Sequence, residues 1–263
     1  MRPHLSQMTP KQRIKRLIAA VPNLTEFQLQ LLDGVVHAFG QPKEFWRKPD
    51  STLVTPEVLE DFGDVLRMHH CFSKEPFSKD KFEYALERVS VGAGISAHLA
   101  PRGQRGFDME IAGERFSLKT EASRAIREGI IHISKFMELG GGTWGSNPDD
   151  LIGLRQQFLT NLHGINRILI LRFLKKGEPQ FLYELVEIPK ALLSKSASGT
   201  FEMMTNSPQM PKPGYCHVKE QDDLLYSLYF DGGTERKLQI KGMQKHLCTV
   251  HASWKFELPT GTL

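Results

Sequence analysis

The sequence has little cysteine and no long hydrophobic run. Its three cysteines lie far apart in the 263-residue chain and form no Cys-x-x-Cys pair. This odd number and wide spacing argue against a disulfide framework and against a cysteine-bound zinc site. The N-terminal segment MRPHLSQMTPKQRIKR has no apolar signal core, and no run of about 18 apolar residues occurs anywhere. We therefore expect a cytoplasmic protein with no membrane-spanning segment.

A strong charge of one sign, internal repeats and low-complexity segments are absent as well. Charged residues make up 24% of the chain and hydrophobic residues 40%, and the net charge is +4. These values are ordinary for a soluble globular protein, and the mild basic excess permits a polyanionic partner without requiring one. The length suits one good hydrophobic core, alone or with a small appended domain.

The N-terminal third of the chain predicts four helices. Capping residues and apolar positions at helical spacing indicate residues 9–40, interrupted at Pro22, then 56–68 and 78–89, with a loop over 41–52. The first helix carries a basic cluster that is either a solvated face or a phosphate contact, formed by Lys11, Arg13, Lys15 and Arg16. On the fourth helix, Glu83 and Glu87 lie one turn apart on a single face.

A β-hairpin follows these helices. Residues 107–111 and 115–120 alternate apolar and polar side chains, and Ala-Gly-Glu between them forms a turn. Because side chains alternate along a strand, Asp108 and Glu110 share one face, and Ser117 and Lys119 share one face of the return strand. The hairpin is either a surface element with a solvated polar face or a site that holds a hard divalent cation beside a lysine.

This hairpin resembles the active site of the PD-(D/E)xK nuclease superfamily, in which an aspartate precedes an acidic-x-Lys motif on the next strand. The string FD…G…FSLKT is especially similar to the motif of the mismatch-repair nicking endonuclease and its restriction-enzyme relatives. Asp108 matches the family aspartate and Lys119 the family lysine. Ser117 stands where the second acid of the family belongs. Some restriction endonucleases of the superfamily also have Ser-x-Lys and recruit a glutamate from the following helix instead.

The resemblance implies where the missing carboxylate comes from. Residues 121–139 predict a helix because apolar residues recur there at helical spacing, so Glu121, Glu128 and Glu138 are candidates. We favour Glu128, since it is nearer the strand end than Glu138 and the two are too far apart to reach one metal. In the mismatch-repair relative, a Leu-Glu pair on a helix precedes the metal-binding aspartate. Leu86-Glu87 repeats this order, which makes Glu87 a further candidate for the site.

The same resemblance implies the chemistry. One or two Mg²⁺ ions would be bound by Asp108, by the recruited Glu128 and by a backbone carbonyl near Leu118. Lys119 would orient or deprotonate the attacking water, and Ser117 could hydrogen-bond a metal-bound water. The implied activity is Mg²⁺-dependent, sequence-specific cleavage of double-stranded DNA by a type II restriction endonuclease. Two alternatives stay open, namely a repair or recombination nuclease of the same fold and a catalytically inactive DNA-binding module.

The rest of the chain predicts an α/β fold with a mixed sheet. Residues 147–162 indicate a helix, 167–174 a central strand buried on both faces, and 181–188 another strand. This order agrees with the αβββαβ core that the resemblance implies. We expect a restriction-endonuclease-like core over residues 76–193, a helical N-terminal region over 1–75, and a C-terminal loop and β-ribbon over 194–263, packed together as one domain.

The C-terminal ribbon carries candidates for DNA contacts. Residues 224–230 and 236–241 predict a hairpin, and on its return strand Lys237, Gln239 and Lys241 point the same way. Together with Arg236 they fit DNA phosphates or guanine edges in a groove, or else they protect an exposed edge strand. Palindromic DNA sites are usually cut by two-fold dimers, so we expect a homodimer. A cognate DNA methyltransferase is expected in the same system, although not in a complex.

Overall fold

Four helices form the N-terminal part of the protein, as the sequence predicts. The computed structural model describes residues 8–258, except residues 102, 105, 124, 142, 178 and 179. The helices are α1 (Pro10–Ala20), α2 (Glu26–Gly40), α3 (Pro56–Phe72) and α4 (Lys79–Gly92). Each follows a Ser or Thr whose side chain accepts a hydrogen bond from a backbone N–H of the first turn. Among the described residues we find no helix with the length and hydrophobicity needed to cross a bilayer.

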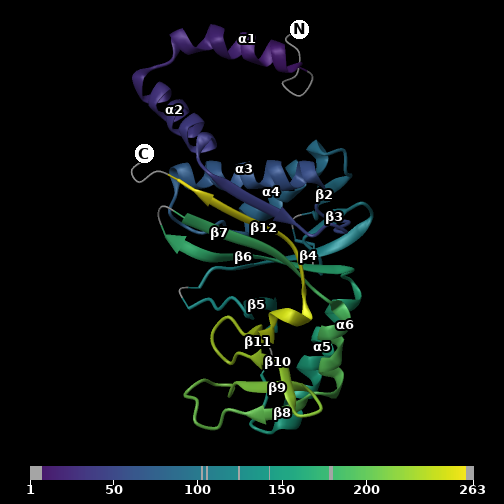
Figure 1. Cartoon of the computed structure of the whole chain (residues 1–263). Coiled ribbons are helices and arrows are strands. Elements are labelled where there is room, and N and C mark those ends of the chain that lie inside the picture. Colours follow the sequence, from purple (N-terminus) through teal and green to yellow (C-terminus); the bar gives the residue numbers. More distant parts are fainter. Residues whose placement is uncertain are drawn as a thin grey trace.

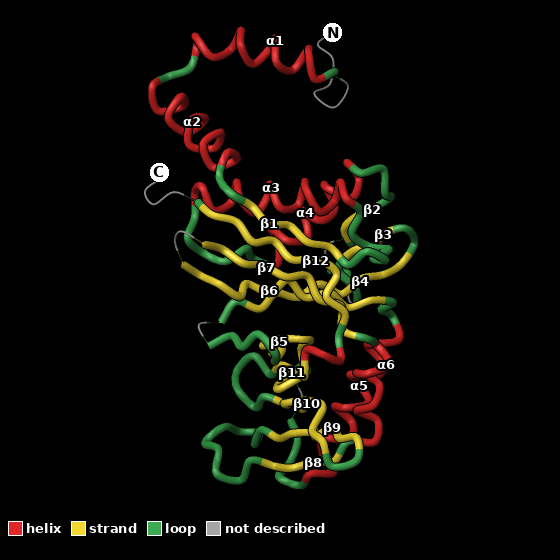
Figure 2. Tube along the Cα trace, in the orientation of Figure 1, coloured by secondary structure: helices red, strands yellow, loops and turns green. Residues whose placement is uncertain are grey.

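A seven-stranded sheet lies against α3 and α4 (Figures 1 and 2). Its strands, in spatial order, are β1 (Lys43–Arg47), β12 (Thr249–Glu257), β7 (Gln180–Ile188), β6 (Arg167–Gly177), β4 (Glu114–Glu121), β3 (Met109–Ile111) and β2 (Ala97–Leu99). β4 and β6 run parallel and every other neighbouring pair is antiparallel, so the predicted mixed sheet is confirmed. The predicted central strand is β6, whose residues 168–171 are at most 2% exposed.

A second, five-stranded sheet is antiparallel throughout. Its strands, in spatial order, are β5 (Ile130–Glu138), β11 (Lys237–Gln244), β10 (Asp223–Phe230), β9 (Gly214–Glu220) and β8 (Thr200–Met203). The remaining helical elements are α5 (Ile152–His163), α6 (Lys190–Ser194) and the 3-10 turns η2 (Val21–Asn23), η3 (Pro148–Leu151), η4 (Lys195–Ser198) and η5 (Lys245–Leu247). Figure 1 shows α5 beside this smaller sheet.

Two hydrophobic cores lie on the two faces of the large sheet. On one face, Leu118 packs with residues of α3 and α4. On the other face, Ile170 packs with residues of α5 and the small sheet. Because successive side chains of a strand point to opposite faces, Leu118 on the helix side places Ser117 and Lys119 on the face toward the small sheet. The predicted site residues therefore stand between the two sheets.

The helix predicted for residues 121–139 does not form. β4 continues to Glu121, and after a turn the chain enters β5. The prediction was wrong because the apolar residues also alternate. Ile131 and Ile133 are buried on one face of β5, which pairs with the distant strand β11. Branched isoleucines and Gly129 disfavour a helix, and this long-range pairing decides the outcome.

Sheet pairing corrects three further expectations. The predicted loop at residues 41–52 contains β1, and the loop predicted to begin the C-terminal region at residue 194 contains β8; both are edge strands. The two strands of the predicted C-terminal ribbon, β10 and β11, are inner strands of the small sheet. The interpretation of residues 236–241 as an edge strand protected by lysines is therefore wrong.

Candidate active site

A tight turn brings the predicted site residues together. Ala112 and Gly113 have φ values of 50° and 83°, as a two-residue type I′ turn requires, and they join β3 to β4. The N–H of Asp108 donates to the carbonyl of Phe116 at 2.8 Å, which extends the pairing one residue beyond β3. Asp108 therefore lies beside the middle of β4.

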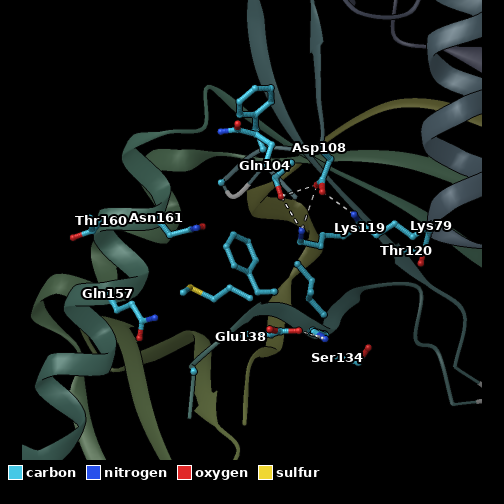
Figure 3. A pocket seen from close by; sticks show the side chains of 18 residues that line it. Lys79, Gln104, Asp108, Lys119, Thr120, Ser134, Glu138, Gln157, Thr160 and Asn161 are labelled. Atoms are coloured by element: carbon cyan, nitrogen blue, oxygen red, sulfur yellow. Dashed lines mark hydrogen bonds and ion pairs between the residues drawn. The ribbon is translucent and has the colours of Figure 1, made fainter. Parts of the chain in front are cut away.

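Asp108, Ser117 and Lys119 form one hydrogen-bonded group, of which Figure 3 labels Asp108 and Lys119. Oδ2 of Asp108 accepts hydrogen bonds from the N–H of Leu118 at 2.6 Å and from the hydroxyl of Ser117 at 3.3 Å. Nζ of Lys119 donates to Oγ of Ser117 at 2.8 Å and lies 3.7 Å from Oδ2 of Asp108. Ser117 thus links the carboxylate to the lysine amine.

A second lysine lies on the other side of Asp108. Lys79, the first residue of α4, places its Nζ 2.7 Å from Oδ1 of Asp108 and 2.5 Å from Oε1 of Glu83. Lys79 and Glu83 are one helical turn apart, so both side chains leave the same face of α4. Two carboxylates from two different elements therefore share one cation. The sequence prediction did not include Lys79 and preferred Glu87 to Glu83.

The surroundings shift the pKa of three of these groups. Burial is the largest influence on Lys119 and lowers its pKa, against the opposing charge of Asp108. Burial would raise the pKa of Asp108, but the nearby Lys119 and Lys79 outweigh it and lower that pKa. Burial also opposes charge on Lys79, yet its bonds to Asp108 and Glu83 raise its pKa. At neutral pH, Asp108 is an anion, and Lys119 loses its proton more readily than Lys79 does.

A cleft of about 850 Å³ opens in front of this group, between the hairpin, β5 and α5. Phe136 of β5 closes it beneath the lysine, with its ring centroid 5.2 Å from Nζ of Lys119. Across from the lysine, α5 presents three polar side chains to the cleft (Figure 3), those of Gln157, Thr160 and Asn161. The cleft therefore combines a charged end with a polar wall.

A second hollow continues the cleft along the small sheet. It shares Glu138 and Gly140 with the cleft and is lined further on by residues 232–236, the loop before β11. Arg236 lines this hollow and donates from Nη1 to the carbonyl of Gly141 at 2.9 Å. A groove therefore runs from Asp108 past β5 to the start of β11.

Comparisons with known proteins show which family contains the chain. The sequence profile of a family of type II site-specific deoxyribonucleases matches residues 17–256. The type II restriction enzyme SmaI of Serratia marcescens is 41% identical over 224 residues, which cover 84% of this chain and 88% of that enzyme. The chain belongs to this family. It is a type II restriction endonuclease, a sequence-specific DNA endonuclease, as the sequence predicts. No solved structure matches the chain.

Two acids predicted to approach the site of this endonuclease lie apart from Asp108. Glu138 lines the cleft, on the side opposite Asp108 (Figure 3). Glu128 lies in the turn before β5, where its side chain is 81% exposed and its carboxylate is 3.9 Å from Nζ of Lys245. Glu128 was expected to approach from a helix, and that premise is wrong because residues 130–138 form β5.

The other two predicted acids have partners elsewhere in the fold. Glu121 is buried, and its Oε2 accepts from Nε of Arg172 at 2.5 Å. Burial raises the pKa of Glu121 although Arg172 opposes this. Oε1 of Glu87 accepts from the N–H of Leu99 at 2.8 Å, which ties α4 to β2. Of the acids that the sequence places on α4, Glu83 therefore reaches the site group, whereas Glu87 anchors a strand.

The donor atoms beside α4 suit a hard divalent cation. Asp108 and Glu83 each place a carboxylate oxygen within 2.7 Å of the same ammonium nitrogen, so the protein already holds a positive charge between them. Magnesium is usually bound through one or two carboxylates and keeps several waters. Among the described residues no group of three or more His, Cys, Asp or Glu side chains is arranged around a metal position. A site here would use these two carboxylates, with Lys79 moved aside.

Three of the four candidate DNA-contacting residues of the endonuclease, Lys237, Gln239 and Lys241, line one face of β11. They point away from the core, as predicted, because Leu238 and Ile240 between them are buried. Each has a partner within the protein: Lys237 pairs with Glu235, Gln239 donates to Asp231, and Nζ of Lys241 lies 3.5 Å from the ring centroid of Tyr229. This face therefore carries polar and aromatic groups.

Proposed function

We propose that Asp108, Ser117 and Lys119 form the catalytic centre of the endonuclease on a PD-(D/E)xK core. The order of α4, β2, β3, β4, α5 and β6 supports this core, with β6 parallel to β4 and β5 inserted between β4 and α5. One observation carries the proposal, namely that the Asp108 carboxylate and the Lys119 amine both bond to Ser117 at the end of a cleft. A groove beside paired carboxylate and amine groups suits phosphodiester hydrolysis.

In this proposal Lys119 acts on the attacking water. Its lowered pKa leaves more of the amine unprotonated than an ordinary lysine has, so it can accept a proton from water. Once protonated, it stabilises the negative charge that develops on the phosphate. The hydrogen bond to Ser117 holds the amine in place. Ser117 therefore positions the lysine and supplies no second negative charge.

The cofactor that fits this centre is Mg²⁺. Asp108 and Glu83 would hold the ion, together with a backbone carbonyl near Leu118. When bound, the ion supplies Lewis-acid stabilisation of the charge that develops on the phosphate. Glu83 takes the role first given to Glu128, because it lies beside Asp108 and supplies the second carboxylate that Ser117 lacks.

The partner of the endonuclease is double-stranded DNA lying along the groove. Arg236 lines its far end, and Lys237, Gln239 and Lys241 follow it on β11; these four residues would contact DNA phosphates or base edges. We further propose that two copies cut the two strands as a homodimer in the cytoplasm, where the DNA is found. A cognate methyltransferase would act separately on the same sites.

Plasmid cleavage tests the catalytic centre. The wild-type protein with Mg²⁺ should give discrete fragments, whereas Asp108→Ala and Lys119→Ala should give none while folding and binding DNA normally. Glu128→Ala is the matched control and should cleave at the wild-type rate. Chelator-sensitive cleavage by Asp108→Ala or Lys119→Ala at a rate near that of the wild type would place the active site elsewhere.

A further inference from the structure

The N-terminal arm, defined as α1, η2 and α2 (residues 10–40), extends away from both sheets (Figure 1). α1 has no buried residue, and its apolar side chains Ile14, Leu17 and Ile18 are 56%, 60% and 68% exposed. Residues at these spacings share one helix face. α1 therefore carries an apolar stripe that nothing in the described chain covers, which is the pattern of a helix that packs on another surface.

The second helix of the arm has two apolar faces. One face, with Gly34 and Ala38 buried, packs toward α3. Leu32, Val36 and Phe39 follow at spacings of four and three residues on the opposite face, and all three are exposed. A helix that is apolar on both sides is normally enclosed on both sides. α2 therefore presents exposed apolar side chains on its outer face, of which Phe39 also lies with its ring centroid 5.4 Å from the Arg67 guanidinium.

An apolar groove lies between α3 and α4, next to the end of α2. It has a volume of about 590 Å³, and side chains such as Val65, Met68 and Tyr84 line it together with Phe39 of the arm. An exposed groove lined mainly by apolar side chains is a feature of interaction sites. The same molecule therefore presents an uncovered apolar helix and an uncovered apolar groove.

The charges of the arm are complementary to those of one wall of the groove. α1 carries four basic residues and no acidic one, since its sequence is PKQRIKRLIAA. The α3 wall of the groove carries Asp61 and Asp64, whereas the α4 wall carries Lys81 and Arg88. A basic helix is attracted to the α3 wall and repelled by the α4 wall. The groove therefore favours one placement of α1, along α3.

We propose that the N-terminal arm of one protomer docks in the α3–α4 groove of a second copy of this chain. Both surfaces occur on every copy, so the exchange is reciprocal and closes as a two-fold dimer. The proposal rests on the homodimer given under the proposed function and names the surface that forms it. α1 would cover the groove, and the outer face of α2 would pack beside it.

The oligomeric state of the full-length protein, measured without DNA or metal, tests the arm. The wild type should be a dimer by sedimentation equilibrium, and Ile18→Asp should raise its dissociation constant at least about tenfold. Ala19→Asp adds the same charge on the side of α1 away from the stripe and should leave the dimer unchanged. A monomeric wild type, or an unchanged dimer in Ile18→Asp, would overturn the proposal while leaving the catalytic centre untouched.

Cross-linking distinguishes exchange between copies from an arm that folds onto its own groove. Leu17→Cys and Met68→Cys are made in separate chains, mixed, and treated with a bismaleimide. A cross-linked dimer in the mixture, and in neither variant alone, is expected. A third protein carries both substitutions, and a cross-link that forms only within its single chain, with no cross-linked dimer in the mixture, would show that each arm covers its own groove and overturn the proposal. Loss of DNA affinity in Ile18→Asp with an intact dimer would assign α1 to DNA and overturn it as well.

Discussion

Two charged clusters stand on the same face of β4, yet only one of them opens to a cleft. The cleft cluster consists of Lys119, Asp108, Lys79 and Glu83, and the closed cluster consists of Arg172, Glu121 and Glu184. Arg172 is 0% exposed, and each of its five N–H groups has an acceptor among the two carboxylates and three backbone carbonyls of the turn before β5. Every donor of the closed cluster is therefore satisfied in place.

The difference shows that buried charge alone does not mark a catalytic group. An arginine keeps its proton at any relevant pH, so the closed cluster can only hold the turn and the strands together. In the cleft cluster, burial lowers the pKa of Lys119, and Lys79 occupies a position that another cation could take. A titratable amine with access to a cleft separates the two clusters, although Lys119 and Glu121 are only two residues apart on one strand.

The largest expected difference between the clusters is in cleavage. Lys119→Met should lower the single-turnover cleavage rate by about a thousandfold or more, because the group that accepts the proton is lost. Its unfolding free energy should change by less than about 1 kcal/mol, since the cost of burying a charge is also removed. Lys135→Met, on the exposed side of the same cleft, serves as the control. Rapid cleavage by Lys119→Met would remove the distinction between the clusters.

The second expected effect is on stability and belongs to the closed cluster. Arg172→Met leaves Glu121 buried without its cation and leaves Glu184 with Lys245 alone, so the unfolding free energy should fall by about 3–5 kcal/mol. Chemical denaturation measures this loss. Arg88→Met, an exposed arginine of α4, should change stability by less than about 0.5 kcal/mol. A loss for Arg172→Met as small as that for Arg88→Met would mean that the closed cluster contributes little to the fold.

Local signals in the sequence predicted the helices and the hairpin. The caps at Thr9, Thr25, Thr55 and Ser78 satisfy backbone groups of their own helix, so no distant partner is needed. The alternation of apolar and polar side chains around Asp108 and Lys119 is also a local signal. By contrast, β1 and β5 were missed because each depends on pairing with a strand far along the chain.

The positions of the acidic residues of the site likewise depend on packing that local sequence does not reveal. Glu83 and Glu87 lie on one face of α4, and only the packing of α4 against the hairpin decides which of them meets Asp108. One usable signal was overlooked: Lys79 stands four residues before Glu83, the spacing at which a lysine and a glutamate pair on a helix. The predicted helix over residues 121–139 led us to expect the missing second carboxylate at Glu128. Local sequence could not place it, because residues 130–138 form a strand.

The third prediction separates the two glutamates of α4. Glu83→Gln should raise the Mg²⁺ concentration needed for half-maximal cleavage by about 10–100-fold, because one of two carboxylates beside the cation position is lost. Glu87→Gln should keep the wild-type Mg²⁺ requirement and lose about 1–2 kcal/mol of stability through a weaker bond to the N–H of Leu99. Magnesium titrations of the two variants check this, and reversed results would return the metal role to Glu87.

The smallest expected effect is on pH dependence. Burial lowers the pKa of Lys119, so its unprotonated fraction rises as the pH approaches that value from below. The wild-type cleavage rate should therefore rise with pH above neutrality by up to about tenfold per unit and level off above the lowered pKa. Asp108, whose pKa is lowered, stays ionised over this range, and Lys79, whose pKa is raised, stays protonated, so neither produces the rise.

Lys119→Arg keeps the positive charge but cannot release its proton, so its residual cleavage should lack the rise. Single-turnover cleavage rates of the wild type and of Lys119→Arg, measured from neutral to alkaline pH, test this prediction. Parallel profiles would mean that Lys119 serves only as a fixed charge, as Arg172 does in the closed cluster.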